Sequence, residues 1–328
     1  MIKRIVTYMA VLLLCILPSS CQRRPLTTAD YAVTINIEIE KDIVNYEYEK
    51  DPSLMRCIFY DSKSGAFVTQ AFLPAHGGLV SLIPGREYDI LVYNFDTEST
   101  WLEDENWFHK IYASTSLIPD SFRTKLRSRA TKGDEEQIVY DPDHLYVGRL
   151  NDVFIPSRSV DAPMVVLDVV CETVVESWIL EAKTITGVEN IGSIAAVITS
   201  LSGSNRIGFN ERSTEFVSVY FDNQVIDENG LLTAKFNTFG WNKDITEPQV
   251  LSLVFTDIAG KGHVYNIDIS NQFPGNKEQI IRIDMEIDIP EPMTSGDGGF
   301  VPKVDEWDEI NTDIIIYTIV ILSVAKDL

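Results

Sequence analysis

The residue types that carry most enzyme chemistry are sparse and widely spaced in this chain. The histidines lie far apart, without the close spacing of a zinc site, at His76, His109, His144 and His263. The sequence also lacks a Gly-x-Ser-x-Gly elbow, a glycine-rich phosphate loop followed by Lys-Ser or Lys-Thr, a His-Glu-x-x-His pair and a Cys-x-x-Cys pair. Because 49 Asp and Glu residues are present, a pair of carboxylates suited to glycoside hydrolysis carries no information by itself. We therefore expect no catalytic residues, no metal site, no cofactor and no enzymatic activity.

One cysteine stands in a context that has a chemical meaning. Two basic residues precede the apolar run Ile5–Leu17, and two serines stand directly before Cys21. An apolar helix of about thirteen residues covers about 20 Å of a hydrocarbon core that is about 30 Å thick, so the run is typical of an export signal. Small residues before a cysteine favour cleavage there and acylation of the sulfur. We therefore expect a signal peptide over residues 1–20, lipidation at Cys21 and a spacer over residues 21–30; an ordinary secretory leader with an incidental cysteine is the alternative.

The folded part of the chain then keeps two cysteines, Cys57 and Cys171. Both lie in apolar sequences typical of strands, in different halves of the chain. An oxidising envelope would permit a disulfide between them. Free cysteines are often simply buried, however, so two buried thiols are the favoured interpretation. Two cysteines cannot make a disulfide-rich scaffold, and hydrophobic cores must therefore supply the stability.

Aromatic side chains are the other residues that could bind a ligand. Trp101, Trp107 and Trp241 could each stack on a sugar ring, because an aromatic face offers apolar contact to the C–H groups of the ring. Packing in a core is the more common use of such side chains. The three tryptophans are therefore candidate glycan contacts, with core packing as the alternative.

Length and composition limit the class of protein to which these residues belong. A chain of 328 residues has room for about two domains of roughly 100–200 residues each. The hydrophobic fraction of 45% is typical of a globular protein rather than a disordered or fibrous chain. The net charge of −22 repels phosphate backbones and anionic surfaces. We therefore expect no nucleic-acid partner.

Alternation of apolar and polar residues predicts that the chain is mainly β. Residues 31–40 place alternate apolar side chains on one face and polar ones on the other. Short β-rich runs separated by turn residues follow, which is typical of an antiparallel sandwich. We expect an N-terminal β-sandwich domain over residues 31–156, with a short helical excursion at Thr97–Leu117.

A second β-rich half follows. Residues 156–163 begin and end with proline and are expected to link two domains. Beyond them, Met164–Val175 is almost continuously apolar and β-branched, as a strand covered on both faces should be. Residues 279–289 show the clearest alternation in the chain. We therefore expect a C-terminal β-sandwich domain over residues 163–290, in tandem with the first.

An acidic tail with an apolar segment occupies residues 291–328. The stretch Ile314–Ala325 is mostly apolar and, at twelve residues, short for a membrane span. Three interpretations stay open for it: a donor strand that pairs with another subunit, a weak membrane contact, and an atypical extension of the chain. The side chains that would carry a donor strand are Ile314, Ile316, Ile319 and Ile321.

Three of these features together resemble one known family. The leader that ends at Cys21, the block Leu79–Asn94 (LVSLIPGREYDILVYN) and the tail sequence Gly299–Ile310 (GFVPKVDEWDEI) are similar to those of the fimbrillin-like lipoproteins, pilus subunits and anchors of Gram-negative anaerobes. The resemblance implies two transthyretin-like or immunoglobulin-like antiparallel β-sandwich domains, export as a lipoprotein, and a sandwich completed by a strand from a neighbouring subunit. Such completion is physically reasonable, because an unpaired sheet edge binds an extended segment through backbone hydrogen bonds.

The resemblance further implies a non-enzymatic role as a fimbrial anchor or accessory subunit in adhesion or assembly. Its expected partners are other fimbrillin-like subunits and, through the lipid on Cys21, the outer membrane. The protein would lie at the cell surface or within a fimbrium. A glycan- or matrix-binding lipoprotein is the alternative, and its partners would be host or matrix glycans or proteins.

Overall fold

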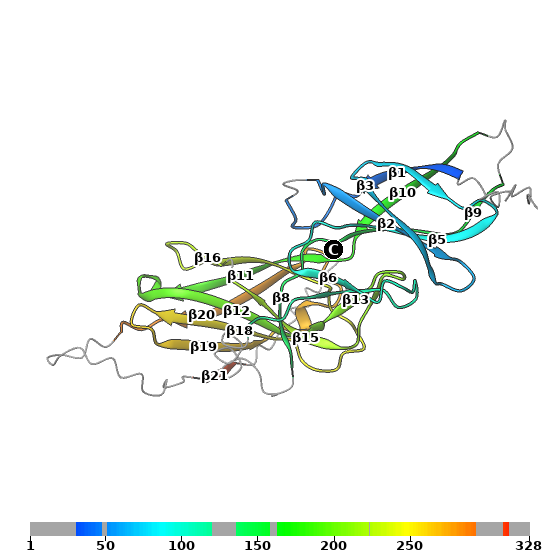
Figure 1. The fold of residues 1–328 in the computed structure, drawn as a ribbon. Helices are drawn as coiled ribbons and strands as arrows, with labels where there is room; N and C mark the ends of the chain where they lie inside the picture. Colours follow the sequence, from blue (N-terminus) through cyan, green and yellow to red (C-terminus); the bar gives the residue numbers. More distant parts are fainter. Residues whose placement is uncertain are drawn as a thin grey trace, which may run out of the picture.

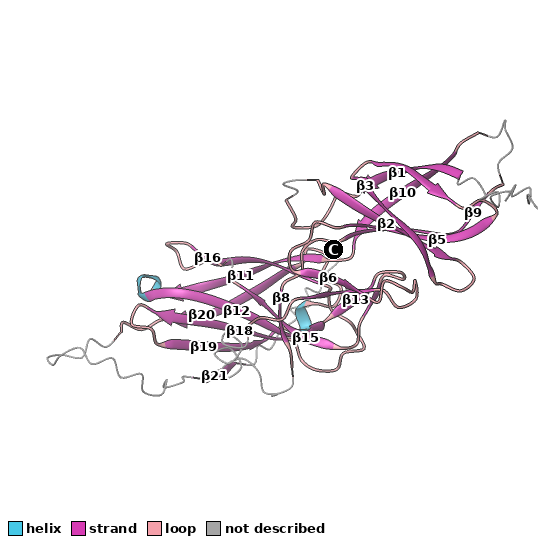
Figure 2. Ribbon diagram, viewed as in Figure 1, coloured by secondary structure: helices cyan, strands magenta, loops and turns pink. Residues whose placement is uncertain are grey.

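The computed structural model describes residues 31–47, 51–119, 136–157, 163–222 and 224–292, together with the backbone of residues 311–314. These residues are mainly β, as the sequence predicts, and their strands form four sheets. Figure 2 shows two short helical turns, both 3-10, at Val188–Asn190 and Ser270–Gln272. In this part of the chain, no helix has both the length and the apolar character that a bilayer crossing needs.

A seven-stranded sheet contains the first strand of the chain. Its order is β3, β2, β5, β9, β10, β1, β4, with the bounds β1 Tyr31–Ile39, β2 Leu54–Asp61, β3 Phe67–Pro74, β4 Gly77–Leu82, β5 Arg86–Asn94, β9 Tyr146–Ile155 and β10 Val165–Thr173. β10 pairs with β9 only at Glu172 and Thr173. The sheet therefore divides into a layer of β3, β2, β5 and β9 and a layer of β10, β1 and β4. Side chains from both layers, such as Ile35, Phe59 and Ile90, fill one core between them.

One predicted boundary falls inside this sheet. We expected residues 156–163 to link two domains, with β10 opening the second. Instead β10 pairs in parallel with β1, beginning with Val33 opposite Val165, and the chain leaves the sheet only at Val174. An apolar β-branched run predicts a strand but not the sheet to which it belongs, because the partner lies 132 positions away in the sequence.

Two further sheets enclose a second large core. The four-stranded sheet has the order β16, β17, β11, β20, and the six-stranded sheet has the order β21, β19, β18, β12, β15, β8. Their bounds are β8 Ile138–Tyr140, β11 Glu176–Thr186, β12 Ile191–Ser202, β15 Phe216–Phe221, β16 Val225–Ile226, β17 Leu232–Thr238, β18 Val250–Asp257, β19 Gly262–Asp268, β20 Ile280–Asp288 and β21 Asn311–Ile314. Leu180 and Ile281 of the first sheet pack with Ile198 and Leu253 of the second. Figure 1 shows these strands together at one end of the molecule, with β1 at the other.

The six-stranded sheet also receives residues from the first half of the chain. β8 pairs in parallel with β15, with Val139 opposite Val219. Ile118 and Ile138 belong to a small core with Tyr220 on this sheet. The chain therefore passes from the seven-stranded sheet to the six-stranded sheet and returns for β9, so the two halves are interlocked.

A small four-stranded sheet joins the halves at a second place. Its order is β14, β13, β7, β6, with the bounds β6 Thr100–Glu103, β7 Tyr112–Thr115, β13 Ser204–Arg206 and β14 Glu211–Arg212. The helical excursion expected at residues 97–117 is absent, because these residues form β6, β7 and the turns around them. Asp104 has a φ of +56°, which a continuing right-handed helix does not permit. Phe108 and Ile111 are buried against Tyr60 and Tyr93 of the seven-stranded sheet.

Candidate functional site

The edge of β19 is where part of the predicted donor strand lies. β21 pairs in parallel with β19, from Val264 opposite Asn311 to Ile267 opposite Ile314. Figure 1 shows β21, in red, beside β19 at the margin of the six-stranded sheet. Val264 and Ile267 are buried, so a strand added here extends a sheet whose side chains already pack in a core. Of the four proposed donor-strand residues, Ile314 therefore lies in β21, and the other three, Ile316, Ile319 and Ile321, lie outside the described residues.

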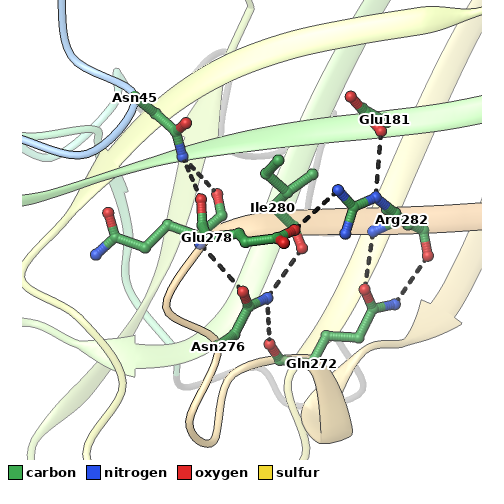
Figure 3. A network of polar contacts seen from close by, with 8 residues as sticks. Asn45, Glu181, Gln272, Asn276, Glu278, Ile280 and Arg282 are labelled. Carbon is green, nitrogen blue, oxygen red and sulfur yellow. Dashed lines mark hydrogen bonds and ion pairs between the residues drawn. The ribbon is translucent and has the colours of Figure 1, made fainter.

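The edge of β20 differs from that of β19, because side-chain amides bond to its backbone groups (Figure 3). The Gln272 amide nitrogen donates to the carbonyl oxygen of Arg282 at 2.9 Å, and the Arg282 backbone N–H donates to Gln272 Oε1 at 2.8 Å. Asn276 Nδ2 donates to the carbonyl oxygen of Ile280 at 2.9 Å. These are the backbone groups that an added strand would use. The two amides therefore act as a cap on the β20 edge at residues 280–282.

Ion pairs and a loop from the first half hold this cap in place. The Arg282 guanidinium lies 3.0 Å from a carboxylate oxygen of Glu278 and 3.5 Å from one of Glu181. Asn45, in the loop after β1, donates to the carbonyl oxygens of Glu278 at 2.7 Å and Gln279 at 3.0 Å. Figure 3 shows that the contacts form one connected network. Of the two edges, β20 is closed by the chain's own side chains and β19 accepts a strand.

A polar cleft of about 1240 Å³ lies beside the small four-stranded sheet. Its aromatic lining comes from His109, Tyr112 and Trp241. Its charged lining is balanced, with the basic residues Lys110, Arg206, Arg212 and Lys243 and the acidic residues Asp104, Glu211, Glu215 and Asp244. Arg212 is fixed in place, since its Nη1 donates to the Trp241 carbonyl oxygen at 2.9 Å and its Nη2 pairs with Glu176. The aromatic and hydrogen-bonding groups together suit a polar ligand with an apolar face, such as a sugar.

The structure places one of the three candidate tryptophans in this cleft. Trp241 lines it and also packs against the core between the four- and six-stranded sheets. Trp101 on β6 is 58% exposed but is not among the lining residues, and its indole N–H donates to Ser116 Oγ. Trp107 lies in the turn before β7, with the Lys110 ammonium 5.9 Å from its ring. The tryptophans therefore do not form a single aromatic platform.

A buried histidine lies where the chain passes from β10 to β11. His144 Nδ1 is 2.9 Å from Thr173 Oγ1, and its Nε2 is 2.8 Å from Ser177 Oγ. Burial lowers the pKa of His144 to about 4, so the ring is neutral at pH 7. A histidine beside a serine is the pairing that activates a nucleophile, but Ser177 is only 4% exposed and does not line the cleft. The contacts therefore join elements rather than forming a reaction centre.

Both described cysteines are free and buried, as the favoured interpretation predicts. Cys57 and Cys171 pack in the core of the seven-stranded sheet. Burial raises the pKa of each thiol to about 12, so both remain protonated. They contribute as small apolar side chains. Cys21, the predicted lipidation site, lies outside the described residues.

Comparison with protein families identifies the group to which these sheets belong. Residues 20–222 match the family described as a domain of unknown function, DUF5119. The chain belongs to the DUF5119 family. It is 28% identical over 237 residues to a Bacteroides ovatus protein named "Putative fimbrium anchoring subunit Fim4B", a match that covers 71% of this chain and 65% of the length of that relative. The resemblance to fimbrillin-like proteins that the sequence predicts is thereby confirmed.

Comparison with solved structures adds two likenesses to this DUF5119 member. One is the crystal structure of a "putative adhesin" from Bacteroides ovatus, with a TM-score of 0.59 and 22% identity, covering 81% of this chain and 94% of that one. Another is the fimbrial anchor protein Mfa2 from Porphyromonas gingivalis, with a TM-score of 0.48 and 13% identity, covering 79% of this chain and 90% of that one. The first likeness shows a common fold.

Sequence reasoning missed the amide cap and the charged lining of the cleft. Gln272 precedes Arg282 by ten positions and Asn276 precedes Ile280 by four, so both spacings were available as a local signal. The lining of the cleft had no such signal. Lys110 and Lys243 are 133 positions apart and line one cleft because tertiary contacts, including the pairing of β7 with β13, bring the two halves of the chain together.

Proposed function

We propose that this DUF5119 member is a non-enzymatic fimbrial anchor or accessory subunit, held at the outer membrane by a lipid on Cys21 and bound to other fimbrillin-like subunits by strand complementation. The observation that carries the proposal is the edge of β19, which takes an extended segment, β21, through backbone pairing. The similarity to a protein named as a fimbrium anchoring subunit supports the same role. The two large cores, each between two layers of strands, support a pair of transthyretin-like or immunoglobulin-like sandwiches.

Strand complementation at β19 follows from the chemistry of a sheet edge. An edge strand presents unpaired N–H and C=O groups, and an incoming strand satisfies them while its apolar side chains extend the core. The same edge can hold the tail of this chain or the corresponding strand of a neighbour, because backbone pairing does not depend on which chain supplies the strand. Because Gln272 and Asn276 cap the β20 edge, a strand from a neighbouring subunit would pair with β19 and not with β20.

The lipid anchor is tested by fractionating cells that express Cys21→Ala. Without the sulfur that carries the acyl chains, the protein should move from the outer-membrane pellet to the soluble fraction. Cys15→Ala is the matched control, because Cys15 lies inside the apolar run of the leader and is expected to be removed with it. A Cys21→Ala protein that stays wholly in the pellet would contradict the anchoring proposal.

Strand complementation is tested by measuring which fimbrillin-like subunits co-purify from mechanically sheared filaments. The double variant Ile314→Asp with Ile316→Asp places charges on the donor segment, so recovery of partner subunits should fall by roughly tenfold, as expected for the loss of about 1.4 kcal/mol or more. Val225→Asp is the control, because Val225 is an exposed apolar residue on β16, at another sheet edge. Equal recovery from the donor-segment variant and the control would exclude the tail as the donor strand.

The cleft favours a second candidate function, glycan binding. The observation that favours it is the position of Trp241. This residue packs against the core and also lines the polar cleft, together with Tyr112 and Arg206. In calorimetric titrations with glycans selected on an array, Trp241→Ala should weaken binding about tenfold or more, since aromatic stacking contributes on the order of 1 kcal/mol and more. Trp101→Ala is the matched control outside the cleft. Equal affinities for both variants would exclude the cleft as the glycan site.

A further inference from the structure

The outer face of the layer formed by β10, β1 and β4 carries exposed apolar side chains at one end. Met164 and Val166, at the start of β10, are 53% and 51% exposed, and Leu79 on β4 is 65% exposed. The pairing registers place Thr34 of β1 opposite both Leu79 and Val166, so these three form one row across the layer. The Thr34 hydroxyl lies 3.6 Å from Met164 Sδ. We call Leu79, Met164 and Val166 the entry patch.

Charge divides this face into two parts. Outward positions near the entry patch are the uncharged Ala32, Thr34 and Ser81. Further along β10 and β1, the outward positions include Asp168, Glu172 and Glu38, and Glu38 lies opposite Val170. One end of the face is therefore apolar and uncharged, and the other is acidic. On a chain with a net charge of −22, an uncharged apolar patch of this kind marks a contact surface.

The entry patch lies at the end of the sheet where the described chain begins. The Tyr31 hydroxyl donates to the Pro163 carbonyl oxygen at 2.7 Å, so β1 and β10 start side by side. Figure 1 shows this end pointing away from the six-stranded sheet. Cys21 precedes Tyr31 by ten positions, and ten residues span at most about 33–36 Å. A lipid on Cys21 would therefore hold this end of the molecule close to the bilayer.

We propose that the entry patch rests in the lipid surface to which Cys21 is anchored, so that the protein stands on the bilayer at this end instead of hanging from a free tether. The inference rests on the lipid anchor of the proposed function. Apolar side chains of a surface-bound protein enter the boundary between headgroups and acyl chains to a depth of about 5–10 Å. Val170 lies four positions beyond Val166, about 13 Å along the strand. Val170 therefore stays in water among the acidic side chains.

The chemistry of the patch also selects the kind of lipid surface. Because the patch is uncharged and the rest of this face is acidic, attraction to the bilayer is apolar and electrostatics opposes approach to anionic lipid. We therefore expect contact with zwitterionic phosphatidylethanolamine and phosphatidylcholine, insensitive to moderate salt. Among the described outward positions of this face, those near the entry patch are uncharged and those farther along β1 and β10 include Glu38, Asp168 and Glu172. The molecule should therefore tilt so that the end with the entry patch faces the bilayer.

The test compares environment-sensitive fluorophores at two matched positions. Val166→Cys and Val170→Cys lie on the same face of the same strand and are 51% and 55% exposed in the wild type, so neither change disturbs a core. Cys57 and Cys171 are buried, and the introduced cysteine is the one that labels. Each labelled, acylated chain is placed in zwitterionic vesicles that contain a bilayer-embedded quencher. We expect a blue shift and about threefold more quenching at residue 166 than at residue 170, given the depth of insertion.

A second variant links the signal to the patch itself. Leu79→Asp in the Val166→Cys chain should reduce quenching at residue 166 to the level seen at residue 170. The change places a charge in the row of Leu79, Thr34 and residue 166, and a charge opposes entry into the bilayer. Equal quenching at both positions in vesicle-bound protein would overturn the inference and leave the lipid anchor intact. A blue shift that appears without vesicles would also overturn it, in favour of contact between two copies. Protein that binds vesicles equally well with Cys21→Ala would instead contradict the anchor of the proposed function.

Discussion

His144 and Asp141 lie three positions apart between β8 and β9, and burial moves their pKa values in opposite directions. Burial lowers the pKa of His144 from 6.5 to about 4 and raises that of Asp141 from 3.8 to about 6. Asp141 Oδ2 accepts a bond from the Asn237 backbone N–H at 3.4 Å, and Asn237 in turn accepts one from Ser177. Both residues therefore belong to one polar region in which each is held in its neutral form more readily than in water.

The pH dependence of stability should separate these two groups. Between about pH 4 and 6.5 the unfolded chain binds more protons at His144, so its contribution to the free energy of unfolding rises with pH and is lost as the pH falls to about 4. Between about pH 3.8 and 6 the native chain binds more protons at Asp141, so that contribution falls as the pH rises. The two contributions oppose each other across pH 4–6.

Urea unfolding at several pH values measures the contributions of His144 and Asp141 to the free energy of unfolding. Relative to wild type, Asp141→Asn should gain stability as the pH rises from 4 to 6, and His144→Gln should lose it, each by up to about 1.4 kcal/mol per pH unit. Using differences from wild type removes the contributions of the other carboxylates. Parallel pH profiles for wild type and both variants would mean that neither group titrates as its burial predicts.

Gly240 offers a test of how the cleft is built. Its φ is +98°, and a Cβ there would lie 2.5 Å from Arg212 Cζ. Gly240→Ala should therefore lose about 2 kcal/mol in the free energy of unfolding, about half from backbone strain and the rest from displacing the guanidinium. Gly260→Ala is the control, because its φ is +87° with nothing within 4 Å of the added Cβ. Equal losses in the two variants would show that Arg212 moves aside freely.

At the scale of elements, β20 of the four-stranded sheet and β19 of the six-stranded sheet present their outer sides in opposite ways. β19 pairs with β21, whereas β20 has its outward backbone groups bonded by Gln272 and Asn276. Edge strands without such protection tend to pair with other chains. If β19 serves assembly as proposed, the cap would keep the β20 edge from associating at the same time.

Removing the cap should produce both a stability loss and a new association. Gln272→Ala leaves the Arg282 N–H and C=O without their amide partners, which should cost about 1–2 kcal/mol in urea unfolding. The freed edge should also raise the proportion of dimer and larger species in light scattering. Asp284→Ala is the control, as Asp284 is an exposed residue on the same strand. A monomeric Gln272→Ala protein would show that the cap serves stability alone.

The local sequence pattern was enough to predict where the strands lie but not which strands pair with one another. Alternation in residues 31–39 and 280–288 predicts β1 and β20 well, because each strand buries one face. It could not show that β10 pairs with β1, since that pairing joins residues 132 positions apart. The aromatic and apolar residues near Trp107 suggested a helix, but Phe108 and Ile111 are buried by a hairpin laid across another sheet. Tertiary contact, absent from local pattern, decided these cases.

At the scale of the whole molecule, one core connects the halves of the chain. Phe239, in the turn after β17, and Ile207, after β13, pack with Tyr93 of the seven-stranded sheet and Phe108 of the hairpin. The junction also carries the connection from β10 to β11 through Val174 and Val175. In the proposed role, a load between the lipid anchor at one end and a pilus strand at the other would pass through this core. Its packing should therefore decide whether the chain unfolds as one cooperative unit.

Phe239→Ala tests that cooperativity. Removing a buried phenyl ring costs about 3–5 kcal/mol, and here the loss falls on the contact between the sheets instead of on either large core. We expect calorimetry to show one transition for wild type and two for Phe239→Ala. Phe236→Ala is the matched control, since Phe236 is equally buried but lies in the core between the four- and six-stranded sheets. Phe236→Ala should lower the melting temperature, but the seven-stranded sheet and the rest of the chain should unfold at temperatures closer together than in Phe239→Ala. A single transition in Phe239→Ala would mean that β8 and the hairpin suffice to keep the halves coupled.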